Sequence, residues 1–396
     1  MTSHAGDSST RALGDSAAKS TLPIIAMVLF YVLSIAVYGV LPLLVGATVD
    51  LLGFTARQAG FIGGADMLGA TVSALLVSLI VPRGHWRLLI ICGIAVVTLA
   101  DVLSGLTRQF PALLLMRILA GLGAGVVLTI ATVSIAETRH PDRVYGFGQA
   151  GIVAYGSPAL YLMPSMLSAF GLRGVFWLLA VLTTFTAPLI RYMPDRPRLP
   201  EPSKTLTSAM RIPARSVIGL AAVLTYFMAQ GAVWAYLDRV GMAHRLAPSS
   251  VGIALSLSAI AGLLGALLAS WMDVRHGRLQ PLIFAAVGTA IALLVLNESA
   301  TLAAFVAMTA LFNFCWNVSV PYQFGVLAEI DPSRRTVALA GVVANAGLAA
   351  GPMVAAALLS ERSVPNVSWI GISFTALSLA LFARILMVRA GVIRIA

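Results

Sequence analysis

The chain has 396 residues, of which 59% are hydrophobic and only 10% are charged. Because a soluble globular protein carries about 25% charged residues, this composition excludes a water-soluble enzyme. The formal net charge of +11 does not indicate a nucleic-acid partner, since the basic residues lie in short gaps between apolar runs, as they do in membrane proteins. We therefore expect a multi-pass membrane protein that is surrounded by a lipid bilayer.

Twelve apolar segments, each long enough to cross a bilayer, follow a polar stretch at residues 1–21 that predicts a disordered cytoplasmic tail. The polar connection 193–214 holds five of the 19 prolines and separates six segments from six. The sequence thus predicts an all-α membrane protein with six-helix bundles at 22–192 and 215–396, joined by a cytoplasmic linker. The segments are 22–46, 58–81, 87–106, 110–136, 144–170, 173–192, 215–237, 249–272, 280–296, 300–328, 335–359 and 364–388.

The basic residues are distributed unequally between alternate gaps. One side of the membrane receives 19 of the 26 Lys and Arg residues and the other side receives six, while Arg117 remains inside a segment. Because cytoplasmic loops carry the excess of Lys and Arg, both termini are predicted on the cytoplasmic side. We expect the membrane to be a bacterial inner membrane.

The two predicted bundles share residues at a common offset of 192 positions. Such an offset indicates duplication, and parallel repeats are typical of transporters whose site lies at the repeat interface near mid-membrane. We therefore expect two pseudo-symmetric bundles. The matching pairs are Gly39 with Gly231, Gly60 with Gly252, Arg83 with Arg275, Glu137 with Glu329, and Arg143 with Arg335.

The motifs of the chain give it a resemblance to a known family. Over residues 22–390 it resembles the major facilitator superfamily, and its fourth segment is similar to that of the proton-driven drug exporters. The gap at 81–87 lacks the acidic residue that this family usually places there. The motifs that carry the resemblance are Asp273-Val274-Arg275-His276-Gly277-Arg278, Arg117 followed by Gly121, Gly123 and Gly125, a degraded Gly156-Ser157-Pro158, and Gly351-Pro352.

This resemblance implies a twelve-helix major facilitator fold and secondary transport of a small molecule by alternating access. It implies no enzyme activity and no cofactor, and we expect a monomer. The leading hypothesis is proton-coupled export of small organic or amphipathic compounds. The alternative is a proton-coupled importer or facilitator of a sugar, organic acid or amino acid, because the first helix lacks the membrane acid of several drug exporters. A membrane-embedded enzyme or a channel is disfavoured.

Arg117 is the most informative single residue, because an arginine about 10 Å deep in a membrane helix is costly and needs a partner. Asp66 and Asp101 lie at similar depth in the second and third segments. The functional hypothesis is a proton-coupling cluster in which protonation of an acid frees Arg117. The alternative is a static buried ion pair, and for Asp101 a position at the outer interface.

Polar and aromatic residues on the first, seventh and tenth helices are candidates for the substrate cavity, because the resemblance implies that these helices line it. Amides inside an apolar span need partners, which favours a polar cavity over lipid. The alternative is hydrogen bonding between helices, and Pro321 is expected to break the tenth helix. The candidates are Tyr31, Ser34, Tyr38, Tyr226, Gln230, Trp234, Asn313, Trp316, Asn317 and Gln323.

Charged residues on the predicted cytoplasmic side could form an inner gate, or could simply set the topology. They are Asp273, Arg275, Arg278, Glu137, Arg143, Glu329 and Arg335. Small residues and prolines could let helices approach closely, which for the glycines is favoured over a dinucleotide loop because no strand precedes them. These packing candidates are Gly121, Gly123, Gly125, Pro158, Gly351 and Pro352. The five histidines lie in tails or polar gaps, so no metal site is predicted.

Overall fold

The computed structural model describes residues 21–80, 85–195, 213–272, 275, 277–298, 301–331, 335–359 and 366–389. Within these ranges all regular secondary structure is helical. The predicted tail, apart from Thr21, lies outside the described residues, and so do residues 196–212 of the predicted linker.

The first membrane crossing is a broken helix. It consists of the segment Thr21–Ser34, the single turn α2 (Ala36–Gly39) and the helix α3 (Leu41–Leu52). The backbone leaves helical geometry at Ile35 and Val40, where φ is −115° and −108°. Pro42 contributes to the second break because it has no N–H to donate into the preceding turn. This crossing ends at Leu52, six residues later than the predicted segment, and its C-cap is Gly53, whose φ of +70° suits glycine.

The other crossings of the N-terminal half are α4 (Ala56–Ile80), α5 (Trp86–Leu106), α6 (Phe110–Ala136) and α7 (Pro141–Phe185) followed by the short η1 (Ala187–Tyr192). Thr55 and Gln58 form reciprocal side-chain bonds to backbone N–H groups at the start of α4, which fixes where that helix begins. The helix α7 contains two crossings, because Gly171 has a non-helical φ of 63° between them.

The C-terminal half contains α8 (Ala214–Ala243), α9 (Pro248–Met272), α10 (Leu279–Glu298), α11 (Leu302–Ile330), α12 (Arg335–Leu358) and α13 (Val367–Arg389). With the broken first helix and the two parts of α7, these make the twelve crossings that the sequence predicts. The prediction that Pro321 breaks its helix is wrong, because α11 continues through it. Membrane helices tolerate proline where neighbouring groups satisfy the freed backbone.

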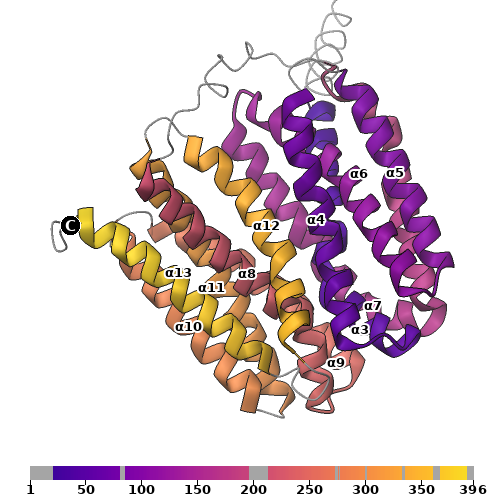
Figure 1. Ribbon diagram of the computed structural model, residues 1–396. Coiled ribbons are helices and arrows are strands. Elements are labelled where there is room, and N and C mark those ends of the chain that lie inside the picture. The colour runs from indigo at the N-terminus through magenta and orange to yellow at the C-terminus, as the bar shows by residue number, and fades with distance from the viewer. Residues whose placement is uncertain are drawn as a thin grey trace, which may run out of the picture.

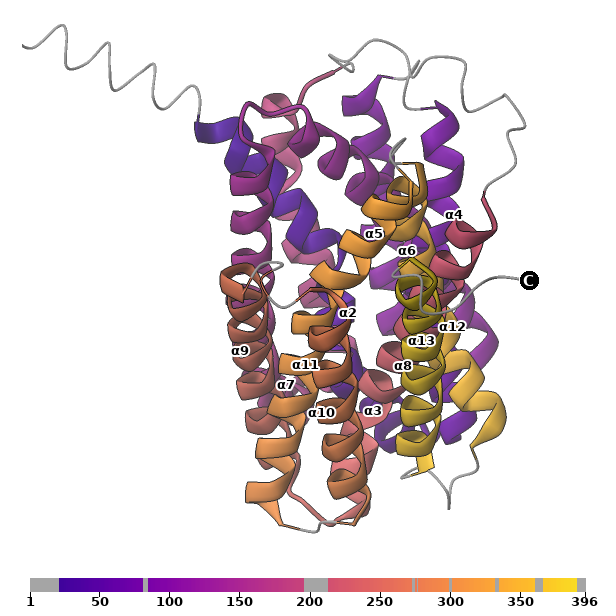
Figure 2. The ribbon, with the colours of Figure 1, turned by 90° about the vertical axis from the view of Figure 1, so that its left-hand side faces the viewer.

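The two halves lie side by side and contact each other mainly through three pairs of helices. Figure 1 shows the C-terminal half, in rose to yellow, beside the N-terminal half, in indigo to magenta. The pairs are α4 with α12, α7 with α9, and α3 with α8. We call the side where α8 begins the linker face, and the side that holds the turn at Gly53 the far face. In Figure 2 the linker face is at the top and α3 lies towards the bottom.

The apolar core that joins the halves lies towards the far face. Its largest cluster includes Leu44 and Leu160 of the N-terminal half together with Val233, Tyr236 and Leu255 of the C-terminal half. A second cluster belongs to the N-terminal half near the linker face, and a third belongs mainly to the C-terminal half. The far end of the interface is therefore closed by apolar packing.

Candidate functional site

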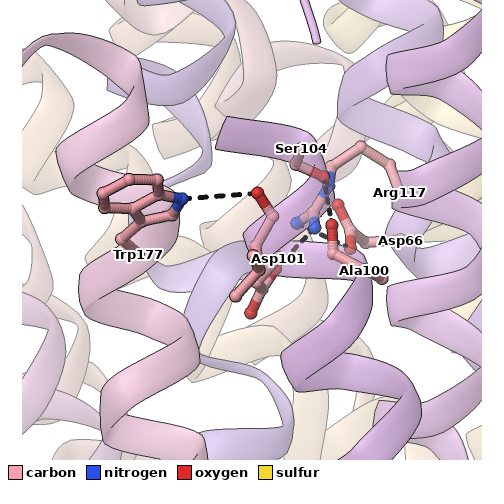
Figure 3. Close-up of polar contacts among 7 residues, drawn as sticks. Asp66, Ala100, Asp101, Ser104, Arg117 and Trp177 are labelled. Carbon is pink, nitrogen blue, oxygen red and sulfur yellow. Dashed lines mark hydrogen bonds and ion pairs between the residues drawn. The ribbon is translucent and has the colours of Figure 1, made fainter. Parts of the chain in front are cut away.

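Arg117 of α6 lies wholly buried between two carboxylates from different helices. Its Nη2 is 2.5 Å from Oδ1 of Asp101 in α5, and its Nη1 is 3.4 Å from Oδ1 of Asp66 in α4. Its Nε donates to Ser104 Oγ at 3.2 Å, as Figure 3 shows, and its guanidinium lies 4.6 Å from the centre of the Phe176 ring. We call Asp66, Asp101 and Arg117 the charge cluster.

The prediction that Arg117 needs acidic partners of similar depth agrees with this geometry. Asp101 makes the shorter contact, and Asp66 makes the longer one. The alternative that Asp101 reaches the outer interface is wrong, because its side chain is only 1% exposed. One helical turn separates Asp101 from Ser104 on α5, so both contact the same guanidinium.

The close approach of α4 and α6 brings Asp66 to Arg117. A Cβ atom added at Gly121 would overlap the backbone carbonyl of Asp66, and one at Gly125 would lie too close to the carbonyl of Ala70. A Cβ at Gly123 would crowd the carbonyl of Gly93 on α5. Small residues of this kind allow membrane helices to pack backbone against backbone. A larger residue at position 121 would displace Asp66 from the cluster.

The charge cluster contains one more acid than base. Oδ2 of Asp66 and Oδ2 of Asp101 are buried, and neither has a hydrogen-bond partner within the described part of the chain. With both acids ionised the cluster carries one net negative charge, and with one proton bound it is neutral. Burial favours the neutral form, whereas Arg117 favours ionised acids. The arrangement can therefore take up and release a single proton.

A small cavity reaches the charge cluster from the first helix. Its volume of about 20 Å³ is enough for one water molecule. Ser34 and Tyr38 line it together with Asp66, Asp101 and Thr183. A second cavity of similar size shares Ser34 and Thr183 with the first. The first cavity gives the two carboxylates a place to contact water.

Several predicted cavity residues meet where the halves join. Tyr226 Oη donates to the carbonyl of Trp316 at 3.3 Å, and Trp234 Nε1 donates to the carbonyl of Tyr38 at 3.0 Å. The rings of Tyr38 and Trp316 are 6.4 Å apart and nearly perpendicular. Gln230 lies between Tyr226 and Trp234 on the same face of α8. It is 0% exposed, and neither of its amide atoms finds a partner among the described residues.

The other polar candidates make their bonds within one half. On α11, Asn313 Nδ2 donates to Ser258 Oγ at 3.0 Å, Asn317 Nδ2 to the carbonyl of Asn313 at 2.9 Å, and Gln323 Nε2 to Ser319 Oγ at 2.8 Å. Tyr31 packs against Tyr145 in the N-terminal half, and Ser34 Oγ bonds to the carbonyl of Phe30. The alternative of helix–helix hydrogen bonding therefore accounts for Asn313.

The predicted gate residues form one ion pair among those described. Arg278 Nε lies 2.7 Å from Glu329 Oε1, and both belong to the C-terminal half. Arg275 is exposed, and Arg143 lies over the ring of Phe147. Glu137 is half-buried where α6 ends. Asp273 and the side chain of Arg335 lie outside the described residues.

Among the remaining packing candidates, Gly351 and Pro352 lie in helix contacts, whereas Pro158 is exposed. A Cβ at Gly351 would overlap the carbonyl of Met228, so α12 and α8 approach closely there. A Cβ added at Gly60 would overlap the hydroxyl of Tyr236 and would lie 3.0 Å from the carbonyl of Pro352, in the contact of α4 with α12. Pro158 is exposed within α7.

Sequence analysis missed a charged contact that joins the halves at the far face. Arg239 of α8 binds Asp50 of α3 with two bonds, Nη1–Oδ1 at 2.7 Å and Nη2–Oδ2 at 2.6 Å, and also contacts Asp238 Oδ2 at 2.7 Å. We call Asp50, Asp238 and Arg239 the far-face clamp. The predicted segments end at 46 and 237, so these residues lie in the predicted gaps. No motif or spacing in the sequence indicates that Arg239 contacts Asp50.

A comparison with protein families identifies the fold. The model of the family described as Major Facilitator Superfamily matches residues 24–238, which is more than half of the chain. The chain belongs to the Major Facilitator Superfamily. This major facilitator protein is therefore a multi-pass membrane protein of a family of small-molecule transporters, and its twelve crossings are those of that fold. Among curated proteins, none matches the chain.

Solved transporter structures resemble the whole major facilitator chain. The nucleoside transporter NupG is 13% identical, with a TM-score of 0.70, and the match covers 92% of this chain and 98% of that one. A D-xylose-proton symporter is 17% identical, with a TM-score of 0.70 and coverage of 91% and 96%. A bacterial homolog of the human lysosomal transporter Spinster, in an inward-facing state, is 17% identical, with a TM-score of 0.66 and coverage of 94% and 95%. At these identities the likeness concerns the fold alone.

Proposed function

We propose that this major facilitator protein is a proton-coupled secondary transporter that exports small organic or amphipathic compounds by alternating access. The observation that carries the proposal is the buried charge cluster, in which two acids share one arginine beside a cavity large enough for water. A buried group of ionisable residues inside membrane helices is a functional site by default, because its insertion is costly. One bound proton neutralises this cluster.

The closed far face supports an alternating-access cycle. The apolar cluster between the halves and the far-face clamp both lie at that end of the interface. In the proposed cycle the halves rock about their contact, the far face opens, and a proton reaches the cluster from outside. Rocking back closes the far face and releases the proton to the linker face, which the distribution of Lys and Arg places in the cytoplasm.

The direction of transport rests on the exporter-like motif of Arg117 followed by glycines, and on Gly351-Pro352. The second candidate, import of a sugar or a similar polar molecule, is favoured by one observation. The first helix offers Ser34 and Tyr38 to the cavity but no acid. Reconstitution into proteoliposomes with an internal pH dye separates the two. An exporter moves protons against the direction of its substrate, and an importer moves both together.

The topology gives a direct prediction. A reporter enzyme that is active only outside the cytoplasm, fused after residue 200, is expected to be inactive, because the excess of Lys and Arg places this linker inside. The same reporter fused after Thr107, at the far face, is expected to be active. The measurement is reporter activity in intact cells. Activity after residue 200 would contradict the proposed orientation.

The far-face clamp gives a second prediction, of modest size. Asp50→Asn removes the carboxylate that Arg239 binds across the halves, but the Asp50 side chain is 49% exposed. An exposed ion pair contributes about 0–1 kcal/mol, so the ratio of far-face-open to closed molecules should rise by at most about fivefold. Accessibility of an engineered cysteine at the far face to an impermeant reagent measures this ratio. A large increase would show that the clamp, and not the apolar cluster, keeps this face closed.

A further inference from the structure

The break in the first membrane helix leaves a carbonyl for the other half to bind. In a continuous helix the N–H of residue 42 would donate to the carbonyl of Tyr38, four residues earlier. Residue 42 is proline and has no N–H. The carbonyl of Tyr38 accepts a backbone N–H at the end of α2, and the Trp234 indole of α8 is its second donor, at 3.0 Å. A proline in one half thus leaves a position on this carbonyl for a donor from the other half.

The side chain of Tyr38 lies between the charge cluster and the C-terminal half. The residue lines the cavity that also contains Asp66 and Asp101. Its ring meets the ring of Trp316 edge to face. Its hydroxyl oxygen is buried and makes no hydrogen bond to any described residue. One residue therefore contacts the other half through its carbonyl and ring, and shares a cavity with the two acids.

The contact of Tyr38 with the C-terminal half and its place in the cavity beside the charge cluster both depend on the conformation of the transporter. Opening of the far face separates α8 from α2 and breaks the bond between Trp234 and Tyr38, which leaves the carbonyl with only the backbone N–H at the end of α2. The short turn α2 has a break on each side, at Ile35 and Val40, so it can move without bending a long helix. A change in the water or proton content of the cavity acts on the same turn through Tyr38.

We propose that Tyr38 is a positioning residue that couples the charge cluster to closure of the far face, with Trp234 as its latch in the other half. The proposal rests on the proton coupling proposed above. Besides the three members of the cluster, the titratable groups that face it are Tyr38 in α2 and Tyr155 in α7, which lies close enough to Asp101 to interact electrostatically. The described parts of α8, α11 and α12 contribute no acid or base there.

A double-mutant cycle tests the latch. Trp234→Phe removes the indole donor and keeps an aromatic ring, and Pro42→Ala restores the N–H that can take the carbonyl of Tyr38. Spin labels at Arg57→Cys and Ser249→Cys, both exposed at the far face in opposite halves, report open and closed distances in a background carrying Cys92→Ala and Cys315→Ala. We expect Trp234→Phe to raise the open-to-closed ratio about 3- to 10-fold, the effect of one hydrogen bond.

In the Pro42→Ala background the effect of Trp234→Phe should shrink to less than about twofold, because the N–H of residue 42 can then replace the indole on the carbonyl of Tyr38. The matched control is Trp177→Phe, which removes an indole-to-carbonyl bond of the same kind within the N-terminal half. It should leave the ratio unchanged. Equal effects of Trp234→Phe in both backgrounds would overturn the latch.

Tyr38→Phe tests the link to the charge cluster, because it keeps the carbonyl and the ring and removes only the hydroxyl. In the parent we expect the far-face distances to respond to pH, and Asp66→Asn to remove that response. Tyr38→Phe should remove it too. A full response in Tyr38→Phe together with a lost response in Asp66→Asn overturns this inference and leaves the proposed function standing. No response in the parent overturns both.

Discussion

Replacing Arg117 by alanine is expected to abolish transport driven by a proton gradient. The guanidinium is the only base of the charge cluster and contacts both Asp66 and Asp101. Without it, two neighbouring buried acids remain, and both are held protonated because burial and like charge disfavour ionisation. A cluster that keeps its protons cannot alternate between two charge states. The measurement is substrate accumulation in proteoliposomes at fixed pH gradients.

The loss must come from coupling and not from misfolding. Arg117→Ala should still insert and elute as the parent does, because protonated acids leave no charge in the membrane. The matched control is Arg173→Ala, which removes an exposed arginine of the same half that lies over Trp177. It should transport normally. Gradient-driven accumulation by Arg117→Ala would refute the coupling role of the cluster.

Replacing Asp66 by asparagine is expected to uncouple transport while leaving exchange intact. Asparagine resembles the protonated acid, so the cluster becomes neutral and stays neutral at every pH. The substrate should then exchange across the membrane at a rate independent of pH, without accumulation. Counterflow of labelled substrate measures exchange, and uptake against a gradient measures coupling.

A neutral contact of the same arginine provides the control for this second result. Ser104→Ala removes the hydroxyl that Arg117 Nε donates to, but it leaves the charge of the cluster unchanged. We expect it to retain coupling. Asp101→Asn removes the shorter ion pair and should in addition lower stability by about 1.5–3 kcal/mol, as for a hydrogen bond to a charged group. If Asp66→Asn accumulates substrate with the parent's pH dependence, a static ion pair is the correct interpretation.

The cluster could be foreseen from sequence because charges inside apolar segments are rare. Arg117 had few possible partners, and depth within each segment selected Asp66 and Asp101. Depth could not rank the two, since the distances depend on how far Gly121 lets α4 approach α6. The twelve crossings followed in the same way from apolar length, although the first helix continued to Leu52 and α8 to Ala243.

Contacts between the halves could not be foreseen. Trp234 and Tyr38 are 196 residues apart, and neither residue's spacing on its own helix indicates that the indole meets the carbonyl. The same holds for Arg239 and Asp50, which belong to different duplicated units. Pro42 is visible in the sequence and indicates a break in the helix. It does not indicate which side chain donates to the carbonyl of Tyr38 at that break.

The two halves differ in the distribution of their charges, and this affects how the protein can evolve. Residues 216–237, 248–272 and 302–328 of the C-terminal half contain no Asp, Glu, Lys, Arg or His, whereas Asp66, Asp101 and Arg117 are all in the N-terminal half. Amides and aromatic rings such as Gln230 and Trp316 can be exchanged without altering the charge of the cluster. Selection by a new compound can therefore change the chemistry of one half while the proposed proton site in the other is inherited intact.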